Sequence, residues 1–323
     1  MVKFLYRHNK DYSRYNIVKS IAQNIKTKKD IYILLPFSKN QFLKYFFKRD
    51  RIINDFFISN YDTYVHDRQK ITKYNPRAWW KYAQDWINFR FSYYLLSDTQ
   101  KHFEYWEELF GKFKGKHLVL PVLADKAIYR PSTKNETGNK SVNILFYGSF
   151  IPLHGVDIIL HAFKILENKN IDFTATIIGN GQTFKTQKAL FESLSLKNVK
   201  MNGEIIDEKN LSDEIRKSDI ILGIFGNSKK AKSVVPNKVF QALACKKTIV
   251  TMNSDAIDEF FTKDDLIQCT NTPKEVAKQL ELIIKDSELR DKISTHGYNS
   301  FMKLYKKSQD EFEMFIAQMG EST

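Results

Sequence analysis

Lysine side chains gather in a segment that ends where a helix is expected to begin. Residues 226–238 contain Pro236 and four lysines. Proline is favoured in the first helical turn, so a helix is predicted to start near residue 236. Lys238 then lies in that turn, where a cation opposes the helix dipole by about 0.3–1 kcal/mol. A bound anion would reverse that sign, so the segment predicts an anion site rather than a solvated loop. Its lysines are Lys229, Lys230, Lys232 and Lys238.

A glycine-containing loop follows an apolar run that ends at Tyr147. Gly148 and Ser149 begin this loop, and His154 and Gly155 end it where a second helix is expected. Gly148 allows a ligand to approach the backbone, and amide groups after Gly155 can face an anion. His154 can donate a hydrogen bond to a phosphate. The alternative is an ordinary loop with a surface histidine.

A second glycine pair, Gly179 and Gly181, follows another apolar run. It lacks the third glycine of a dinucleotide-binding fingerprint, and a lone Gly-x-Gly is weak evidence for a nucleotide. The chain contains no GxxxxGK[ST] motif, which excludes a P-loop enzyme.

His66 and Asp67 are the catalytic candidates of the N-terminal part. They follow Tyr64 and Val65 at the end of a predicted strand, where a histidine can contact an acceptor hydroxyl. Hydrogen-bonded structure without catalysis is the alternative. The chain shows no Ser-His-Asp order and no HExxH metal motif, so we expect no metal site.

Apolar runs that alternate with helix-period segments position the C-terminal candidates. Helical spacing is clear in Val156, Ile159, Leu160 and Phe163. Six strands that alternate with helices predict a parallel sheet covered on both faces, with ligands at the carboxyl ends of its strands. The predicted strands are 143–150, 172–179, 199–203, 219–225, 248–253 and 265–269. The predicted helices are 156–166, 182–196, 209–218, 236–246 and 272–286.

The N-terminal part predicts a smaller α/β domain. Its expected strands are 4–7, 30–35, 63–66, 93–97 and 118–122. Residues 131–140 have no large apolar side chain and predict a linker. The predicted organisation is a basic, aromatic-rich domain at 1–130, the linker at 131–140, a C-terminal domain at 141–300 and a helical tail at 301–323.

Charge separates the two parts of this 323-residue chain, whose formal net charge is +14. Residues 1–140 carry 27 Lys and Arg against 13 Asp and Glu, whereas residues 141–323 carry 24 of each. The 42% hydrophobic content excludes a disordered or fibrous chain. No apolar run is long enough for a spanning helix, and the charged N-terminus is not a signal peptide. Cys245 and Cys269 form no metal-ligand spacing, which fits a reducing cytoplasm.

The basic part also carries clustered aromatic residues, at 42–49 and 79–82. Basic residues beside aromatic rings suit an anionic membrane surface, and they also suit single-stranded nucleic acid. A merely solvated basic face is the third interpretation, and any single ring belongs more often to a core.

Taken in order, these segments resemble the GT-B glycosyltransferases, specifically the retaining family 4 type. The resemblance rests on Gly148 with Gly155, Ile178 to Gly181, Asn202 to Ile205, Ser218 with Asp219, and Ala242 to Val250. It implies two Rossmann-type parallel-sheet domains that face each other across a cleft. The domain at 1–130 would be the acceptor-side domain, and the domain at 141–300 would bind the nucleotide sugar. The family's paired glutamates, eight positions apart, fall on Ser233 and Gln241. The donor-binding residues that it implies are Gly148, Ser149, His154, Gly155, Gly179, Gly181, Ile205, Ser233, Val234, Val235, Asn237, Lys238 and Gln241.

The resemblance implies transfer of a sugar from a nucleotide diphosphate donor to a lipid-linked or cell-surface glycan acceptor. It also implies retention of anomeric configuration and no metal or other cofactor. We expect the protein to be cytoplasmic and peripheral at the inner face of the cell membrane, to bind an anionic membrane surface and to bind no nucleic acid. The alternatives are a non-catalytic nucleotide-sugar-binding subunit, suggested by the missing glutamates, and a nucleic-acid-binding protein.

Overall fold

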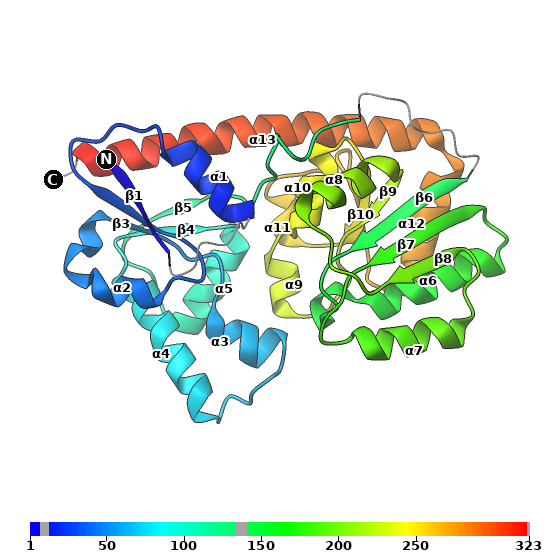
Figure 1. Cartoon of the computed structure of the whole chain (residues 1–323), viewed down its shortest axis with the longest axis horizontal. Coiled ribbons are helices and arrows are strands. Elements are labelled where there is room, and N and C mark those ends of the chain that lie inside the picture. The colour runs from blue at the N-terminus through cyan, green and yellow to red at the C-terminus, as the bar shows by residue number, and fades with distance from the viewer. Residues whose placement is uncertain (7–12, 133–140, 322–323) are drawn as a thin grey trace. The chain divides into compact units, whose positions relative to one another are not determined.

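The structure is a computed structural model that describes residues 1–6, 13–132 and 141–321. Its residues form two compact units (Figure 1). The first unit comprises Met1–Leu123, Ser233–Val235 and Leu304–Thr323, and the second comprises Ala124–Lys232 and Pro236–Lys303. Most of the predicted linker, residues 133–140, lies outside the described residues.

A parallel five-stranded sheet forms the centre of the first unit. Its strands lie side by side in chain order, and Phe4 and Ile53 flank Ile33 in register. The central strands are buried and rich in isoleucine and leucine, as expected of a sheet covered on both faces. The strands are β1 (Val2–Leu5), β2 (Ile31–Leu34), β3 (Ile52–Asp55), β4 (Tyr94–Ser97) and β5 (Lys116–Val119).

The helices of the first unit begin at polar caps and pack aromatic side chains together. Thr99 caps α5 by accepting a hydrogen bond from the His102 amide. Phe56, Phe89 and Trp106 form the centre of an aromatic core beside the sheet. The helices are α1 (Ser13–Ala22), α2 (Asn40–Lys44), η1 (Phe46–Arg51), α3 (Asn60–Asp62), η2 (Thr63–Asp67), α4 (Pro76–Phe91) and α5 (Gln100–Phe110).

The strand predicted at 63–66 is wrong, because Thr63–Asp67 is a helical turn. Ser59 caps the preceding helix by accepting from the Asp62 amide at 3.0 Å, and the chain then continues in helical conformation. The local cap therefore outweighs the β-branched and aromatic side chains of this segment. The missing strand is β3, which pairs with β2 and β4.

A parallel six-stranded sheet forms the second unit, and all six predicted strands are present. Their order is β11-β10-β9-β6-β7-β8. The chain order reverses at β6, which pairs with both β7 and β9. Such a reversal is where ligands bind in open α/β sheets. The strands are β6 (Val142–Tyr147), β7 (Phe173–Ile178), β8 (Val199–Asn202), β9 (Ile220–Leu222), β10 (Thr248–Met252) and β11 (Ile267–Cys269).

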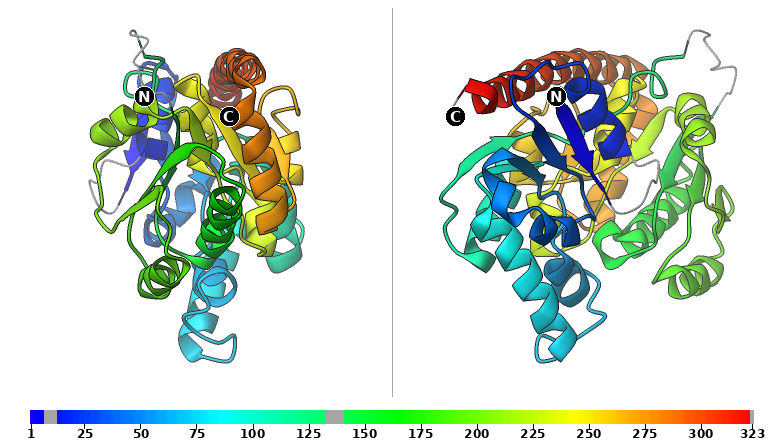
Figure 2. Two further views of the ribbon diagram at one scale, coloured as in Figure 1. Left: turned by 90° about the vertical axis from the view of Figure 1, so that its right-hand side faces the viewer. Right: turned by 60° about the vertical axis from the view of Figure 1, so that its left-hand side comes forward.

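Helices flank this sheet on both sides (Figure 2), and α6 packs against both α7 and α12. Thr272 caps α12 and Pro273 occupies its first turn, so this helix begins where the sequence predicts. The second unit contains η3 (Pro152–His154), α6 (Val156–Asn168), α7 (Phe184–Leu194), α8 (Glu208–Lys217), α9 (Lys229–Ser233), α10 (Asn237–Ala244), α11 (Asp255–Asp258) and α12 (Pro273–Lys285).

The predicted helical tail belongs to one long helix, α13 (Ser287–Glu321). Its residues up to Lys303 group with the second unit, and those from Leu304 group with the first. Tyr94 of β4 contacts the ring of Phe315 on this helix within the first unit. The chain's last helix therefore completes the core of its first sheet.

The environment of His117 in β5 predicts that the first unit is less stable at acidic pH. Its ring stacks on Phe103 and lies 2.7 Å from Ser97 Oγ, and burial lowers the pKa of His117 to about 4. Between pH 6.5 and 4, His117 is protonated in the unfolded state but not in the folded state. The free energy of unfolding therefore falls on acidification by up to about 1.4 kcal/mol per pH unit.

His117→Phe keeps the stacking and removes the titration. Urea unfolding at pH 7 and pH 5 should show a loss about 2 kcal/mol smaller in the variant than in the parent. Equal losses in both proteins would contradict this assignment.

Candidate functional site

A pocket of about 170 Å³ lies at the carboxyl ends of β6 and β7, beside the order reversal of the sheet. The loop after β8 closes one side of it. Its position agrees with the rule for open parallel sheets. The lining residues are Tyr147, Gly148, Ser149, Ile178, Gly179, Asn180, Glu204, Ile205, Ile206 and Leu211.

Two glycines let the loops after β6 and β7 touch at the base of this pocket. Gly148 and Gly179 have φ angles of 133° and 138°, which L side chains rarely adopt. A Cβ at Gly179 would lie 2.0 Å from the Gly148 carbonyl oxygen, so no larger residue fits there. The Gly148 amide donates to the Ile178 carbonyl at 3.0 Å. The glycines therefore permit this close contact between the two loops, and both of them line the pocket.

Lys238 is the second residue of α10 and its side chain is buried, with 4% exposed. The Nζ atom lies 4.0 Å from the Phe146 ring centre and donates to the Gly223 carbonyl at 3.3 Å. A Cβ added at Gly148 would lie 3.4 Å from that Nζ atom, so the ammonium group reaches the pocket's edge.

No ion pair joins Lys238 to a carboxylate in the part of the chain that the structure describes. Burial lowers the pKa of Lys238 well below its ordinary value. A buried cation that contacts a carbonyl and the rings of Phe146 and Tyr147 carries a desolvation cost, which a bound anion would offset.

His154 lies beside Lys238 and is held neutral. Burial, and then the neighbouring Lys238, lower the pKa of His154 well below its usual value, against a hydrogen bond to the Ser149 backbone. Its ring contacts the edge of Phe146. The Nδ1 atom is buried and has no hydrogen-bond partner among the described residues.

Gln241 connects two buried tyrosines across the interior of the second unit. Its Oε1 atom accepts from the Tyr147 hydroxyl at 2.7 Å, and its Nε2 atom donates to the Tyr129 hydroxyl at 2.9 Å. Burial raises the pKa of both tyrosines, so each hydroxyl stays protonated. Tyr147 also lines the pocket, and through it Gln241 reaches the site.

The other donor-side candidates have different positions. Gly155 forms the left-handed cap of α6, Gly181 lies in an exposed part of the loop after β7, and Asn237 begins α10. Ile205 lines the pocket with an exposed side chain. The remaining candidates group with the first unit: Ser233, Val234 and Val235.

The catalytic candidates His66 and Asp67 lie in the helical turn η2 of the first unit. His66 is exposed, with its ring against the edge of Tyr61, and Asp67 is buried. Neither lines the pocket of the second unit.

The sequence did not indicate Tyr129 and Tyr147 as site residues. They meet Gln241 across 112 and 94 positions of the chain, and no local pattern marks such a contact. Glu204 and Asn180 lie in motifs that the sequence did indicate, next to the glycines, and their place in the lining follows from those motifs.

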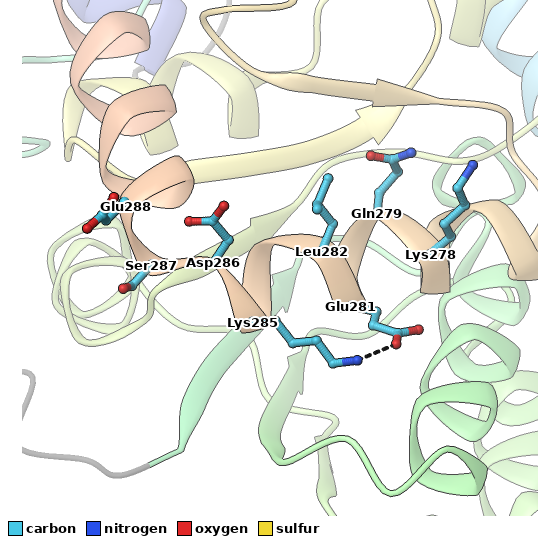
Figure 3. A pocket seen from close by; sticks show the side chains of 8 residues that line it. All are labelled: Lys278, Gln279, Glu281, Leu282, Lys285, Asp286, Ser287 and Glu288. Atoms are coloured by element: carbon cyan, nitrogen blue, oxygen red, sulfur yellow. Dashed lines mark hydrogen bonds and ion pairs between the residues drawn. The ribbon is translucent and has the colours of Figure 1, made fainter.

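A larger open hollow of about 670 Å³ lies where α12 meets α13 (Figure 3). Glu281 in it pairs with Lys169 and Lys285 at 2.7 and 2.6 Å, which lowers the pKa of Glu281 to about 2. The carboxyl end of α12 lies at the amino edge of the sheet, because this helix starts at the carboxyl end of β11. Because the carboxylate of Glu281 is paired with lysines and the hollow lies at the amino edge of the sheet, we interpret this hollow as a feature of the surface and not as a ligand site.

Among the residues that the structure describes, no three His, Cys, Asp or Glu side chains gather in a way that would hold a metal ion. In the same described ranges, no helix is long and apolar enough to span a membrane.

Residues 130–300 match the model of the family described as glycosyl transferases group 1. The chain belongs to this family. The matched range contains the pocket, Lys238 and the contact of Gln241 with Tyr147, and Tyr129 lies one residue before it. An uncharacterized glycosyltransferase of Methanocaldococcus jannaschii is 25% identical over 166 residues, covering 47% of this chain. The alignment spans 41% of that relative, less than half of its length.

Solved structures share the two-sheet architecture of this family member. Sucrose-phosphate synthase from Thermosynechococcus elongatus has a TM-score of 0.70 at 9% identity, over 91% of this chain and 74% of that one. HepE from Anabaena, solved with UDP and glucose, has a TM-score of 0.67 at 12% identity, over 98% of each chain. These similarities confirm the predicted GT-B-like class, an α/β fold with two Rossmann-type parallel-sheet domains.

Proposed function

We propose that this chain is a glycosyltransferase that moves a sugar from a nucleotide diphosphate donor to a lipid-linked or cell-surface glycan acceptor. The donor lies in the pocket of the second unit, and the reaction retains the anomeric configuration without a metal ion. Family membership supports the reaction class. The complex of HepE with UDP and glucose supports a donor of this kind.

One observation carries the proposal: a buried lysine, with no carboxylate partner among the described residues, stands beside Gly148, where a side chain would crowd its ammonium group. Negative charge grows on the leaving diphosphate as the sugar bond breaks. A cation already fixed in a site of low dielectric stabilises that charge without reorganising. Lys238 meets this requirement once a bound phosphate offsets its desolvation, and the missing side chain at Gly148 leaves room beside its ammonium group.

Other residues of the second unit contact different parts of the donor. The pocket beside Ile205 and Ile206 accepts the base, and the neutral His154 contributes a hydrogen bond to a phosphate or the sugar. Gln241 orients the ribose through the polar group that it shares with Tyr147. No side chain has to act as a nucleophile in this arrangement.

Gln241 provides a test of the ribose contact. Gln241→Glu places a carboxylate that can accept from both tyrosine hydroxyls, so donor binding should be kept or improved. Gln241→Leu removes the polar group that would pair with a ribose hydroxyl, at a cost of about 1–3 kcal/mol, and should weaken donor binding. Calorimetry with the same nucleotide sugar compares them, and two variants that bind like the parent would remove Gln241 from the ribose.

The acceptor side of the proposal rests on charge. The first 140 residues hold the whole net excess of +14, which suits an anionic membrane surface. We infer that the protein works peripherally at the inner face of the cell membrane, close to a lipid-linked acceptor. Several contacts of about 1 kcal/mol each would give reversible docking.

A non-catalytic nucleotide-sugar-binding subunit is the second candidate. It is favoured by Ser233 and Gln241 at the family's glutamate positions, and by the engagement of both polar atoms of Gln241 with tyrosines. Turnover of a bound donor by the purified protein separates the two candidates.

A thermal-shift screen of nucleotide sugars tests donor binding. A ligand at 100 times its Kd adds about 2.7 kcal/mol to the folded state, which raises the apparent Tm. We expect at least one nucleoside diphosphate sugar, and its free diphosphate, to raise the Tm. No shift with any donor would contradict the proposal.

A further inference from the structure

Helix α4 of the first unit presents tryptophan side chains to solvent. Trp79 and Trp80 are 67% and 70% exposed, and Trp86, two turns along the same side of the helix as Trp79, is partly exposed. The opposite side of α4 is buried, with Ala78 and Phe89 among its contacts with the unit. The chain has four tryptophans, and three of them lie on this outer side. Soluble surfaces rarely gather large rings without a partner.

A strongly basic segment surrounds these rings. Between residues 68 and 84 the chain has five Lys and Arg and no Asp or Glu. Lys70, Lys73 and Arg77 are exposed, and Tyr74 between them is 76% exposed. Cations beside exposed aromatic rings match the two layers of a membrane interface, where headgroup phosphates lie outside the acyl chains.

Local contacts hold this surface in place. The Trp79 indole donates to the Lys73 carbonyl at 2.9 Å, which ties the loop before α4 to the helix. Lys81 lies 3.9 Å from the centre of the Tyr64 ring. In every ribbon view of Figures 1 and 2 the loop and the start of α4 protrude from the sheet of their unit. The rings therefore stand on a projecting element whose loop is tied to its helix.

The same features disfavour two other partners. Single-stranded nucleic acid uses rings inside a basic groove, whereas these exposed rings line neither described pocket. A second copy that docked face to face would bring ten like charges together, with no acidic residue of the segment to pair with them.

We propose that Trp79, Trp80 and Trp86, with the basic segment 68–81, form the surface that docks this protein on an anionic phospholipid bilayer. The tryptophans enter the interface while Lys70, Lys73 and Arg77 contact headgroup phosphates. This inference rests on the proposed membrane-bound acceptor, and it names the part of the first unit that reaches the lipid.

Tryptophan fluorescence tests the surface directly, because the fourth tryptophan, Trp106, is fully buried. The full chain is titrated with vesicles of phosphatidylcholine and phosphatidylglycerol (70:30), and with phosphatidylcholine alone. We expect a blue shift of the emission, and quenching by brominated lipid, with the anionic vesicles only. Moderate salt should reverse both effects.

Three variants locate the contact by vesicle sedimentation. Trp79→Ala with Trp80→Ala, and separately Lys73→Glu with Arg77→Glu, should each weaken binding to anionic vesicles more than tenfold. The charge-matched control, Lys185→Glu with Lys188→Glu on exposed positions of α7, should bind like the parent. All these side chains are exposed, and circular dichroism verifies that each variant folds.

The possible results decide the inference separately from the proposed function. Donor binding is measured separately, as the rise in Tm that nucleotide sugars cause. If that rise is the same in the α4 variants as in the parent, donor binding is intact, whatever the vesicle experiment shows. Docking that survives both α4 variants, or no docking at all, would overturn the inference. So would tighter binding to random RNA than to vesicles, or a concentration-dependent dimer that Trp79→Ala with Trp80→Ala abolishes.

Discussion

Replacing Lys238 with alanine should weaken the binding of nucleoside diphosphates by one to two decades while nucleoside binding changes little. The lost contact is charge-assisted, and such hydrogen bonds contribute about 1.5–3 kcal/mol. Isothermal calorimetry with the diphosphate and with the matching nucleoside measures the difference. Equal losses for both ligands would remove Lys238 from the diphosphate site.

Lys238→Met separates binding from folding. The native lysine is buried beside a ring and a carbonyl, and its pKa lies well below the ordinary value because the charged form is poorly solvated. An apolar side chain of similar length removes that cost, so the Tm without ligand should rise while diphosphate binding falls. A lower Tm together with weaker binding would indicate a structural role instead.

Arg14→Ala should unfold or severely destabilise the first unit, by about 3–5 kcal/mol. Arg14 and Asp55 are both fully buried, and the guanidinium donates to the two carboxylate oxygens at 3.0 and 2.9 Å. Its third nitrogen donates to the carbonyls of Leu120 and Pro121 at 2.6 and 2.7 Å. The truncation leaves a buried carboxylate without its cation, and Asp55 already has a pKa raised by desolvation.

Chemical denaturation of two comparison variants makes this prediction specific. Arg14→Met combined with Asp55→Leu removes both charges and should recover much of the lost stability. Lys3→Ala breaks an exposed ion pair with Asp30 and should change the free energy of unfolding little. Similar effects of Arg14→Ala and Lys3→Ala would contradict the role assigned to the buried pair.

The second unit was predictable from sequence because its elements are locally consistent. Five of its six strands are apolar runs between polar turns, and helix-period segments with caps such as Thr272 separate them. The first unit was harder. Its strand Ile52–Asp55 has only four residues, half of them polar, and follows a basic segment that hides it. The Thr63–His66 pattern predicted a strand, but the Ser59 cap just before it had already started a helix.

The residues of the candidate site also fall into those that the sequence indicated and those that it did not. Gly148, Gly179 and Lys238 lie in local patterns, a glycine after a strand or a lysine at a helix start, and sequence alone indicated them. The contacts of Gln241 with Tyr129 and Tyr147 depend on how distant segments pack, and no spacing rule supplies them. The exposure of Trp79 and Trp80 is also a tertiary property, because a tryptophan pair on a helix is more often part of a core.

A sugar-transfer assay tests the central claim most directly. The purified chain is incubated with each nucleoside diphosphate sugar, labelled in the sugar, and with lipid and glycan extracts of the organism that encodes it; Lys238→Ala is the paired control. The account predicts that label enters the extract with release of the nucleoside diphosphate, at a rate that the variant reduces at least tenfold. Donors that bind the parent but are never turned over would contradict the account and identify a non-catalytic subunit.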